Sequence, residues 1–340
     1  MNIELNRISF ASDNNSGVIP EALDAIQKVN QAHVPAYGND PVTEYARVLF
    51  KDKFGAEETF FVFNGTGANN LCLKAMLKSF EAVICASTSH LNHDEGGAPE
   101  NVLGTKLYLI PTEDGKIRPE QIKAHIFRMG DPHRAQPRVL SITQPTEYGT
   151  VYTIEEMKAL SKEAKRLGLY FHIDGSRLVH ACTSLGVSLR EITKDVGADA
   201  VSFGGTKNGL MVAEACVFFD KTLAKYVPFY QKQFFQLAGK SRYVAAQFIA
   251  FLENDIWKKY SENCLRLAKK LEEGVRQQGI QVTQKVQANT VFAIIPKEKI
   301  NEVREKFFFY IWDEFTNEVR WMTTWDTTDE MVDSFLSALL

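Results

Sequence analysis

Short apolar runs alternate with amphipathic segments over the first two thirds of the chain. Between two of these runs, apolar residues recur at three- and four-residue spacing (Ile154, Met157, Leu160, Ala164 and Leu167), which predicts a helix packed against a sheet. A second helix is predicted over residues 68–77. The alternation predicts an α/β domain with a mostly parallel mixed sheet. The predicted strands are 59–63, 82–86, 106–110, 138–143, 169–173, 200–203 and 215–219.

The pattern changes near Arg242, where a long helical stretch begins and runs to about residue 278. A strand at 290–295, a helix at 297–306, an aromatic run at 307–312, a strand at 319–323 and a last helix are predicted after it. The sequence therefore predicts two domains. Residues 1–241 form the large one, with the N-terminal segment, and residues 242–340 form a smaller α+β domain that includes the long linking helix.

Composition narrows the class of ligand. The chain has 340 residues, 45% of them hydrophobic, and 39 Lys and Arg against 42 Asp and Glu. These values are typical of a soluble globular protein, and the mixed charges give no basic surface for nucleic acid or an anionic membrane. The longest uncharged stretch, residues 59–73, is too short to cross a bilayer as a helix. We expect a small-molecule partner.

The termini and cysteines indicate the compartment. The N-terminus lacks the basic and apolar segments of a signal peptide. The chain has five cysteines, an odd number, and no two of them form a CxxC pair. This pattern predicts buried thiols in a reducing cytoplasm. They are Cys72, Cys85, Cys182, Cys216 and Cys264.

Ligands of open parallel sheets bind beyond the carboxyl ends of the strands, so the residues after each predicted strand carry the candidate chemistry. After the strand at 59–63 comes Asn64-Gly65-Thr66-Gly67, at the start of a helix. Glycines and free N–H groups there would suit a phosphate. The alternative is an ordinary glycine turn.

Two further strand ends carry charged residues. Asp174 follows the strand at 169–173, and Arg177 comes three residues later. The carboxylate could hold a protonated ring nitrogen and the guanidinium a ligand carboxylate, or the two could pair with each other. Lys207 follows the strand at 200–203 between apolar flanks, which favours an amine nucleophile over a solvated surface charge.

The segment from Ser89 to Gly97 is rich in titratable groups. His90, His93 and Asp94 are conceivable metal ligands, but their spacing is not HExxH and no second histidine-rich segment completes a site, so no metal is predicted. His90 is interpreted instead as a group facing a cofactor, with a structural histidine as the alternative. With the phosphate turn, the aspartate and the lysine, it completes the set that a pyridoxal phosphate site requires.

The chain resembles the low-specificity threonine aldolases of the pyridoxal-phosphate-dependent β-eliminating lyase and aldolase group. The resemblance implies the fold type I architecture of aspartate aminotransferase. The matching motifs are SDN at 12–14, AYGNDPV at 36–42, NGTGANN at 64–70, SHLNHDEGG at 89–97, HIDGSRL at 172–178, SFGGTKNG at 202–209 and VRWMTTWDTT at 319–328.

The resemblance also implies residue roles. Lys207 would form a Schiff base with pyridoxal 5'-phosphate, Asp174 would hold the pyridine nitrogen and His90 would stack on the ring. The remaining cofactor and substrate contacts are implied for Gly65, Thr66 and Thr206 at the phosphate, for Ser12, Arg177 and Arg320 at the substrate carboxylate, and for Tyr37 and Arg242 reaching across a subunit interface. A homodimer or homotetramer with its site at that interface is expected.

Two departures from the family pattern bear on the substrate. Many members have Thr-His-Asn where this chain has Thr146-Glu147-Tyr148, and the commoner lysine motif SKGLG is replaced by SFGGTKNG. The expected reaction is cleavage of threonine, allo-threonine or a phenylserine-like amino acid to glycine and an aldehyde. His90, His93 or a water near Glu147 would take the β-hydroxyl proton.

Other activities remain open from the sequence alone. The same cofactor-binding and substrate-binding residues would serve β-elimination or transamination. From other classes, the alternatives are a metal-dependent hydrolase built on His90, His93 and Asp94, and a catalytically silent cofactor-binding relative.

Overall fold

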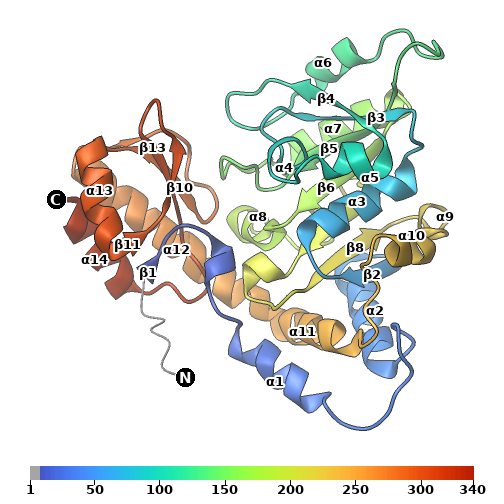
Figure 1. The fold of residues 1–340 in the computed structure, drawn as a ribbon, viewed down its shortest axis with the longest axis horizontal. Helices are drawn as coiled ribbons and strands as arrows, with labels where there is room; N and C mark the ends of the chain where they lie inside the picture. The colour runs from blue at the N-terminus through green and yellow to red at the C-terminus, as the bar shows by residue number, and fades with distance from the viewer. Residues whose placement is uncertain (1–7) are drawn as a thin grey trace.

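A seven-stranded mixed sheet organises the larger part of the molecule in a computed structural model that describes residues 8–340 (Figure 1). Its strand order is β2-β8-β7-β6-β5-β3-β4, and β8 alone runs against the other strands. The predicted mostly parallel mixed sheet is thus confirmed. The strands are β2 (Glu58–Val62), β3 (Glu81–Ala86), β4 (Lys106–Ile110), β5 (Gln136–Thr143), β6 (Tyr170–Gly175), β7 (Ala200–Gly204) and β8 (Glu214–Phe218).

Helices cover both faces of this sheet, which explains why its strands are continuous apolar runs. Val83 and Ile84 are neighbours on β3, yet they belong to two different hydrophobic clusters on opposite faces. The surrounding helices are α1 (Pro20–Lys28), α2 (Pro41–Phe54), α3 (Gly65–Met76), α4 (His90–His93), α5 (Ala98–Leu103), α6 (Pro119–Ile122), α7 (Ile154–Arg166), α8 (Leu178–Leu185), α9 (Lys221–Ala224) and α10 (Val227–Gln233).

Local capping sets where the two predicted helices begin. Helix α7 starts at Ile154, as predicted, because Thr153 and Glu156 form a reciprocal capping box. Helix α3 begins at Gly65, earlier than the predicted residue 68, because the side chain of Asn64 accepts a hydrogen bond from Gly67 N at 2.7 Å. The glycine-rich motif is therefore the first turn of a helix.

The C-terminal part has its own antiparallel sheet of order β12-β13-β10-β9 and its own hydrophobic cluster. The strands are β9 (Gln281–Val282), β10 (Thr290–Ile294), β12 (Tyr310–Asp313) and β13 (Glu318–Met322). Helices α12 (Ile256–Gln277), α13 (Lys297–Lys306) and α14 (Asp329–Leu339) pack around them (Figure 1). Among residues 8–340, no helix is both long and apolar enough to cross a membrane.

The prediction of one long helix from residue 242 to 278 is wrong. Helix α11 (Arg242–Leu252) and α12 are separate, joined by the 3-10 turn η4 (Glu253–Asp255). Asn254 and Asp255 have φ values of 55° and 51°, so the chain leaves right-handed helical geometry there. Helix α11 packs on the large sheet, whereas α12 leads to the C-terminal part.

The N-terminal segment lies beside the C-terminal part. Strand β1 (Ile8–Ser9) pairs in parallel with β11 (Phe307–Phe308), and Phe10 is buried in the C-terminal cluster. The 3-10 turn η1 (Asp13–Asn15) follows and brings Ser12 and Asp13 between the two sheets. The domain boundary between residues 241 and 242 stays a prediction.

Candidate active site

A cavity of about 330 Å³ lies between the carboxyl edge of the large sheet and the C-terminal part. Eight segments far apart in the sequence meet there, as expected for an open α/β sheet. The lining residues that matter below are Ser12, Asn14, His90, Asp94, Thr146, Glu147, Arg177, Lys207, Tyr310, Trp312, Arg320 and Met322. The structure thus brings together five of the predicted site residues in one cavity, namely Ser12, His90, Arg177, Lys207 and Arg320.

Lys207 reaches this cavity from the 3-10 turn η3 (Thr206–Asn208), which follows β7. Burial, and then the positive charge of Arg177, lower the pKa of its amine. Lys207 makes no hydrogen bond or ion pair with any described residue. A half-buried lysine whose amine has a lowered pKa and free donors is suited to act as a nucleophile.

Asp174 lies buried near the end of β6, where it is held by neutral donors. Its Oδ1 accepts hydrogen bonds from the backbone N and the hydroxyl of Ser176 at 3.0 and 2.7 Å, and its Oδ2 accepts one from Asn69 Nδ2 at 2.9 Å. Burial alone would raise the pKa of Asp174. His90, these hydrogen bonds and Lys207 lower it overall, so the carboxyl is ionised at neutral pH.

His90 is connected to Asp174 through a second buried acid. His90 Nδ1 lies 2.9 Å from Glu95 Oε1, and Asn69 Nδ2 donates to the same oxygen at 2.7 Å. Burial lowers the pKa of His90, but the hydrogen bond with Glu95 and the charge of Asp174 raise it above the ordinary value. The ring of His90 is therefore held by a chain of hydrogen bonds through Glu95, Asn69 and Asp174. These residues lie in the sequence motifs, but the motifs do not predict the contacts between them.

The metal alternative based on His90, His93 and Asp94 is not formed as a cluster. Within residues 8–340, the group of histidine and acidic side chains close enough to share an ion is His90, Glu95 and Asp174. His93 and Asp94 are exposed. In the cluster that does form, the carboxylates already accept hydrogen bonds from Asn69, Ser176 and His90.

Two arginines line the cavity, one from each part of the molecule. Arg177, after β6, donates from Nη2 to Asp13 Oδ1 at 2.8 Å and from Nε to Asp13 Oδ2. Arg320, on β13, lies over the ring of Trp312 at 5.1 Å and donates to the carbonyl of Ala11. Its buried Nε has no hydrogen-bond partner among the described residues. Such an orphaned cationic donor is suited to binding an anion.

The electrostatics of these arginines differ. The pair between Asp13 and Arg177 overcomes burial, so the pKa of Asp13 falls and that of Arg177 rises. Arg320 forms no ion pair with a carboxylate within residues 8–340. Burial, and then the nearby charge of Arg177, lower its pKa to about 10. The carboxylate of Asp13 balances one of the two guanidinium charges. The cavity is therefore suited to bind one further anion beside them.

The predicted phosphate residues meet at a tight crossing of backbones. A Cβ built on Gly204 would lie 2.1 Å from Ser176 O, and one built on Gly65 would lie 3.8 Å from Ser176 Oγ. Asn208 Nδ2 also donates to Ser176 O at 3.0 Å. Helix α3, the turn after β6 and the turn carrying Lys207 are thus in contact. Thr206 Oγ1 accepts from Ala213 N at 3.1 Å in the same turn.

Tyr37 and Arg242 lie outside the cavity. Tyr37 has φ 60° and is 54% exposed, with Lys232 Nζ 5.4 Å from its ring centre. Arg242 begins α11 and donates to the carbonyl oxygens of Gln31 and Ala32. Their predicted roles across a subunit interface stay predictions.

The residues present fit pyridoxal 5'-phosphate. The fit rests on a half-buried lysine that makes no hydrogen bond with any described residue, an ionised buried aspartate near the end of a neighbouring strand, and the glycine start of α3 beside both. A Cβ built on Gly65 would make an ordinary van der Waals contact with Ser176 Oγ, so the missing side chain lets a ligand approach the backbone closely there. These are the groups that hold the aldehyde, the ring nitrogen and the phosphate of that cofactor.

Four residues of this site were not identified from the sequence. Asp13, Asn69 and Glu95 lie inside the quoted motifs, but their motifs do not say which side chain each would meet. Trp312 lies in the aromatic run at 307–312, which the hydrophobic pattern assigns to packing.

Comparisons with known proteins show which family and which folds the chain resembles. The beta-eliminating lyase family matches residues 9–298. A low specificity L-threonine aldolase of Pseudomonas aeruginosa is 42% identical over 329 residues, which cover 95% of this chain and 94% of the relative. A threonine aldolase structure from Leishmania major has a TM-score of 0.93 at 27% identity and 98% coverage of both chains. An aspartate aminotransferase of Thermus thermophilus, at 16% identity, has a TM-score of 0.70 over 98% of this chain and 92% of that one, a likeness of fold.

Proposed function

The chain belongs to the beta-eliminating lyase family and has the fold type I architecture, and from that premise we propose that it is an aldolase dependent on pyridoxal 5'-phosphate. It cleaves β-hydroxy-α-amino acids, such as threonine, allo-threonine or phenylserine, to glycine and an aldehyde. The observation that carries the proposal is the unbonded amine of Lys207 in one cavity with Arg177 and Arg320. The names of the relatives in Pseudomonas aeruginosa and Leishmania major support the same reaction.

The cofactor residues have the following roles in this proposal. When bound, pyridoxal phosphate supplies an electron sink for the bond that breaks at Cα. Lys207 Nζ would hold its aldehyde carbon. Asp174 keeps the ring nitrogen protonated, and His90 stacks on the ring. Gly65, Thr66 and Thr206 bind the phosphate.

The substrate residues fix the direction of cleavage. Arg177 and Arg320 bind the α-carboxylate from two sides, and Ser12 lies beside them in the cavity. Holding the carboxylate in this way would fix the orientation of the substrate and so select the Cα–Cβ bond for cleavage. Both arginines are needed because Asp13 already neutralises much of the charge on Arg177.

We further propose a homodimer or homotetramer in the cytoplasm. The segment around Tyr37 and Lys232 is exposed, and Phe229 and Phe235 beside it are 67% and 89% exposed. Exposed aromatic side chains of this kind favour a protein interface. The five free, buried cysteines suit a reducing compartment. Tyr37 and Arg242 would act across that interface, and the domain boundary would fall between residues 241 and 242.

Product analysis tests the proposed reaction. Purified enzyme loaded with pyridoxal phosphate is given threonine, serine and phenylserine, and the products are identified. Aldehyde with an equal amount of glycine is expected. Ammonia with an oxo acid would indicate β-elimination, and amino-group transfer to an added oxo acid would indicate transamination. Activity lost to a chelator in a colourless protein would indicate a metal-dependent hydrolase, and a coloured protein inert toward every substrate would indicate a silent relative.

A further inference from the structure

Glu147 lies at the wall of the cavity, and its two carboxyl oxygens differ in their hydrogen bonding. Its Oε1 accepts hydrogen bonds from the backbone N of His90 and from Thr143 Oγ1, both at 2.7 Å. Its Oε2 is buried and has no hydrogen-bond partner among the described residues. A buried oxygen without a partner is unusual and needs a functional explanation.

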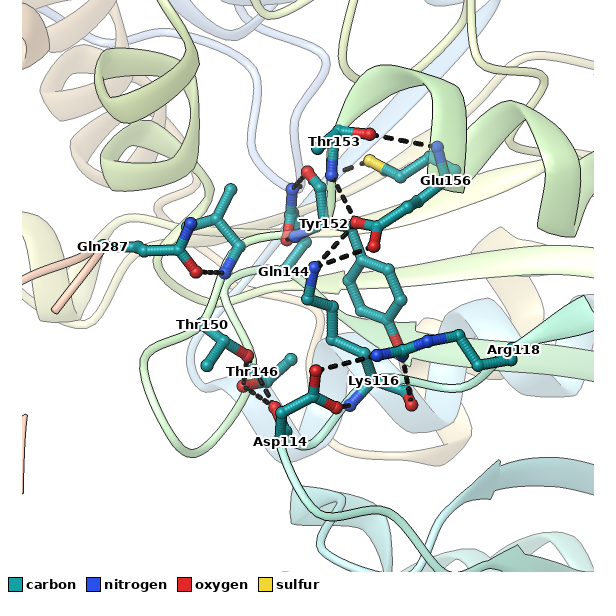
Figure 2. A network of polar contacts seen from close by, with 12 residues as sticks. Asp114, Lys116, Arg118, Gln144, Thr146, Thr150, Tyr152, Thr153, Glu156 and Gln287 are labelled. Carbon is teal, nitrogen blue, oxygen red and sulfur yellow. Dashed lines mark hydrogen bonds and ion pairs between the residues drawn. The ribbon is translucent and has the colours of Figure 1, made fainter. Parts of the chain in front are cut away.

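Glu147 lines the cavity from a loop whose Thr146 and Thr150 are braced by polar contacts. Figure 2 shows the contacts of these two threonines. The hydroxyls of Thr146 and Thr150 lie 2.7 Å apart, and Thr150 Oγ1 donates to the carbonyl of Asp114 at 2.6 Å. The backbone closes the same turn, because Thr146 N donates to Thr150 O at 2.9 Å. A Cβ built on Gly115 would lie 2.7 Å from Thr146 Oγ1, so the two loops are in close contact.

The bracing loop is itself held by charged groups away from the cavity. Arg118 donates to Asp114 Oδ2 at 2.8 Å, and Lys116 donates to Glu156 Oε2 at 2.7 Å (Figure 2). Gln287, from the C-terminal part, accepts from Val151 N at 3.1 Å. The position of Glu147 is therefore fixed from both parts of the molecule, which is how a catalytic group is preorganised.

The surroundings let this carboxyl exchange a proton near neutral pH. Burial, and then the charge of Asp174, raise the pKa of Glu147 to about 7, although hydrogen bonds from Thr143 and His90 lower it. A base works best when its pKa lies near the working pH.

The other titratable groups that face the cavity do not fill this role. They are His90, Asp94, Arg177, Lys207, Tyr310 and Arg320. The arginines are bound to the carboxylate and Lys207 to the cofactor in the proposed function. The imidazole of His90 is tied to Glu95 by its Nδ1. Asp94 and Tyr310 are exposed, and neither shares the buried setting of Glu147 Oε2.

We propose that Glu147 is the catalytic base that accepts the proton of the substrate's β-hydroxyl group. The inference rests on the proposed function and deepens it, because the sequence leaves that base open among His90, His93 and a water. Glu147 occupies the position where many members of the family have histidine. The carboxyl thus replaces an imidazole as the proton acceptor.

The step balances without an added reactant. The O–H bond breaks and its proton goes to Glu147 Oε2, while the oxygen's electrons form the C=O bond of the aldehyde. The Cα–Cβ bond breaks, and its electron pair stays with Cα. One proton then leaves Glu147 and one reaches Cα, which gives glycine. Nothing is oxidised or reduced.

Glu147→Gln tests this role with three readouts. The amide keeps an oxygen for the bonds from His90 and Thr143 but cannot accept the proton. We expect kcat for phenylserine or threonine cleavage to fall about 10²–10⁴-fold, with KM little changed. Exchange of the glycine α-proton with deuterated water, followed by NMR, involves no β-hydroxyl and should persist. The acidic limb of the wild-type kcat/KM profile, with an apparent pKa near 7, should disappear.

Asp94→Asn is the matched control, since it removes the other non-cofactor carboxylate that faces the cavity. It should keep most of the cleavage rate. Normal cleavage by Glu147→Gln would overturn the proposal, and so would equal loss of cleavage and of glycine exchange in a folded variant, which would indicate a structural role. Failure of the proposed function itself looks different, because the wild-type enzyme would then release no aldehyde and would not exchange glycine protons.

Discussion

Arg177 donates both Nε and Nη2 to the buried carboxylate of Asp13, which lies 164 residues earlier in the chain. The pair joins the turn after β6 to the N-terminal segment that packs with the C-terminal part. The guanidinium is thus oriented before any ligand enters, and only its remaining N–H groups are available to a substrate carboxylate.

Asp13→Asn should weaken substrate binding through Arg177. The variant removes the charge that orients the guanidinium, and a hydrogen bond between charged groups is worth about 1.5–3 kcal/mol, so KM should rise about tenfold or more. Steady-state kinetics with phenylserine, alongside a thermal unfolding curve, measure the two effects. An unchanged KM in the folded variant would show that Arg177 needs no partner.

Trp312→Ala should loosen Arg320, whose guanidinium lies over the indole at 5.1 Å. Such cation–π contacts are worth about 0.5–2 kcal/mol, so KM should rise about 2–30-fold with little change in kcat. Trp312→Phe keeps an aromatic face and is the matched control. If both variants bound substrate equally well, the stacking would have no role in positioning Arg320.

Asn69→Leu should disturb Asp174, which it contacts directly although the two residues lie 105 positions apart in the chain. Asn69 Nδ2 bridges Glu95 and Asp174, and its hydrogen bond lowers the pKa of Asp174. Without it the pKa of Asp174 should rise, and the cofactor should dissociate more readily, which equilibrium dialysis measures. Asn70→Leu is the control, because Asn70 contacts Glu95 but makes no hydrogen bond to Asp174. Equal cofactor retention in both variants would contradict the bridge.

Glu147→Gln should change how stability depends on pH. The pKa of Glu147 rises from 4.5 to about 7 on folding, so the protonated carboxyl stabilises the fold below pH 4.5 and this contribution is lost as the pH rises through 7. At pH 8 the variant should be more stable than wild type, by up to about 3 kcal/mol, and the difference should vanish near pH 4.5. Urea unfolding of the cofactor-free proteins at both values measures it. A difference independent of pH would mean that Glu147 titrates normally.

The large sheet was predictable because its strands are short, continuous apolar runs. The predicted bounds of the strand at 106–110 and the helix at 297–306 match the structure at both ends, since the apolar pattern and the residues that flank it indicate the same limits. The break between α11 and α12 was not predictable from periodicity, because Asn254 and Asp255 are polar positions that a solvent-facing helix would also tolerate. Strand β1 was missed because its pairing with β11 spans almost the whole chain.

A residue of the candidate site could be predicted from the sequence where its placement follows from the end of the strand that precedes it. Lys207, Asp174 and Arg177 are of this kind, and the structure places all three at the carboxyl edge of the sheet. Asn69 and Asp13 act through partners 105 and 164 residues away. Only the fold decides which carboxylate each meets, so no local pattern identifies them.

The most direct test of the central claim is the stoichiometry of products from wild-type enzyme and Lys207→Ala, measured side by side with pyridoxal phosphate present. The wild-type enzyme should convert a β-hydroxy-α-amino acid to glycine and aldehyde in equal amounts and carry a borohydride-reducible chromophore, and Lys207→Ala should do neither. Normal turnover and a reducible chromophore in Lys207→Ala would contradict the account, as would wild-type enzyme that forms no glycine.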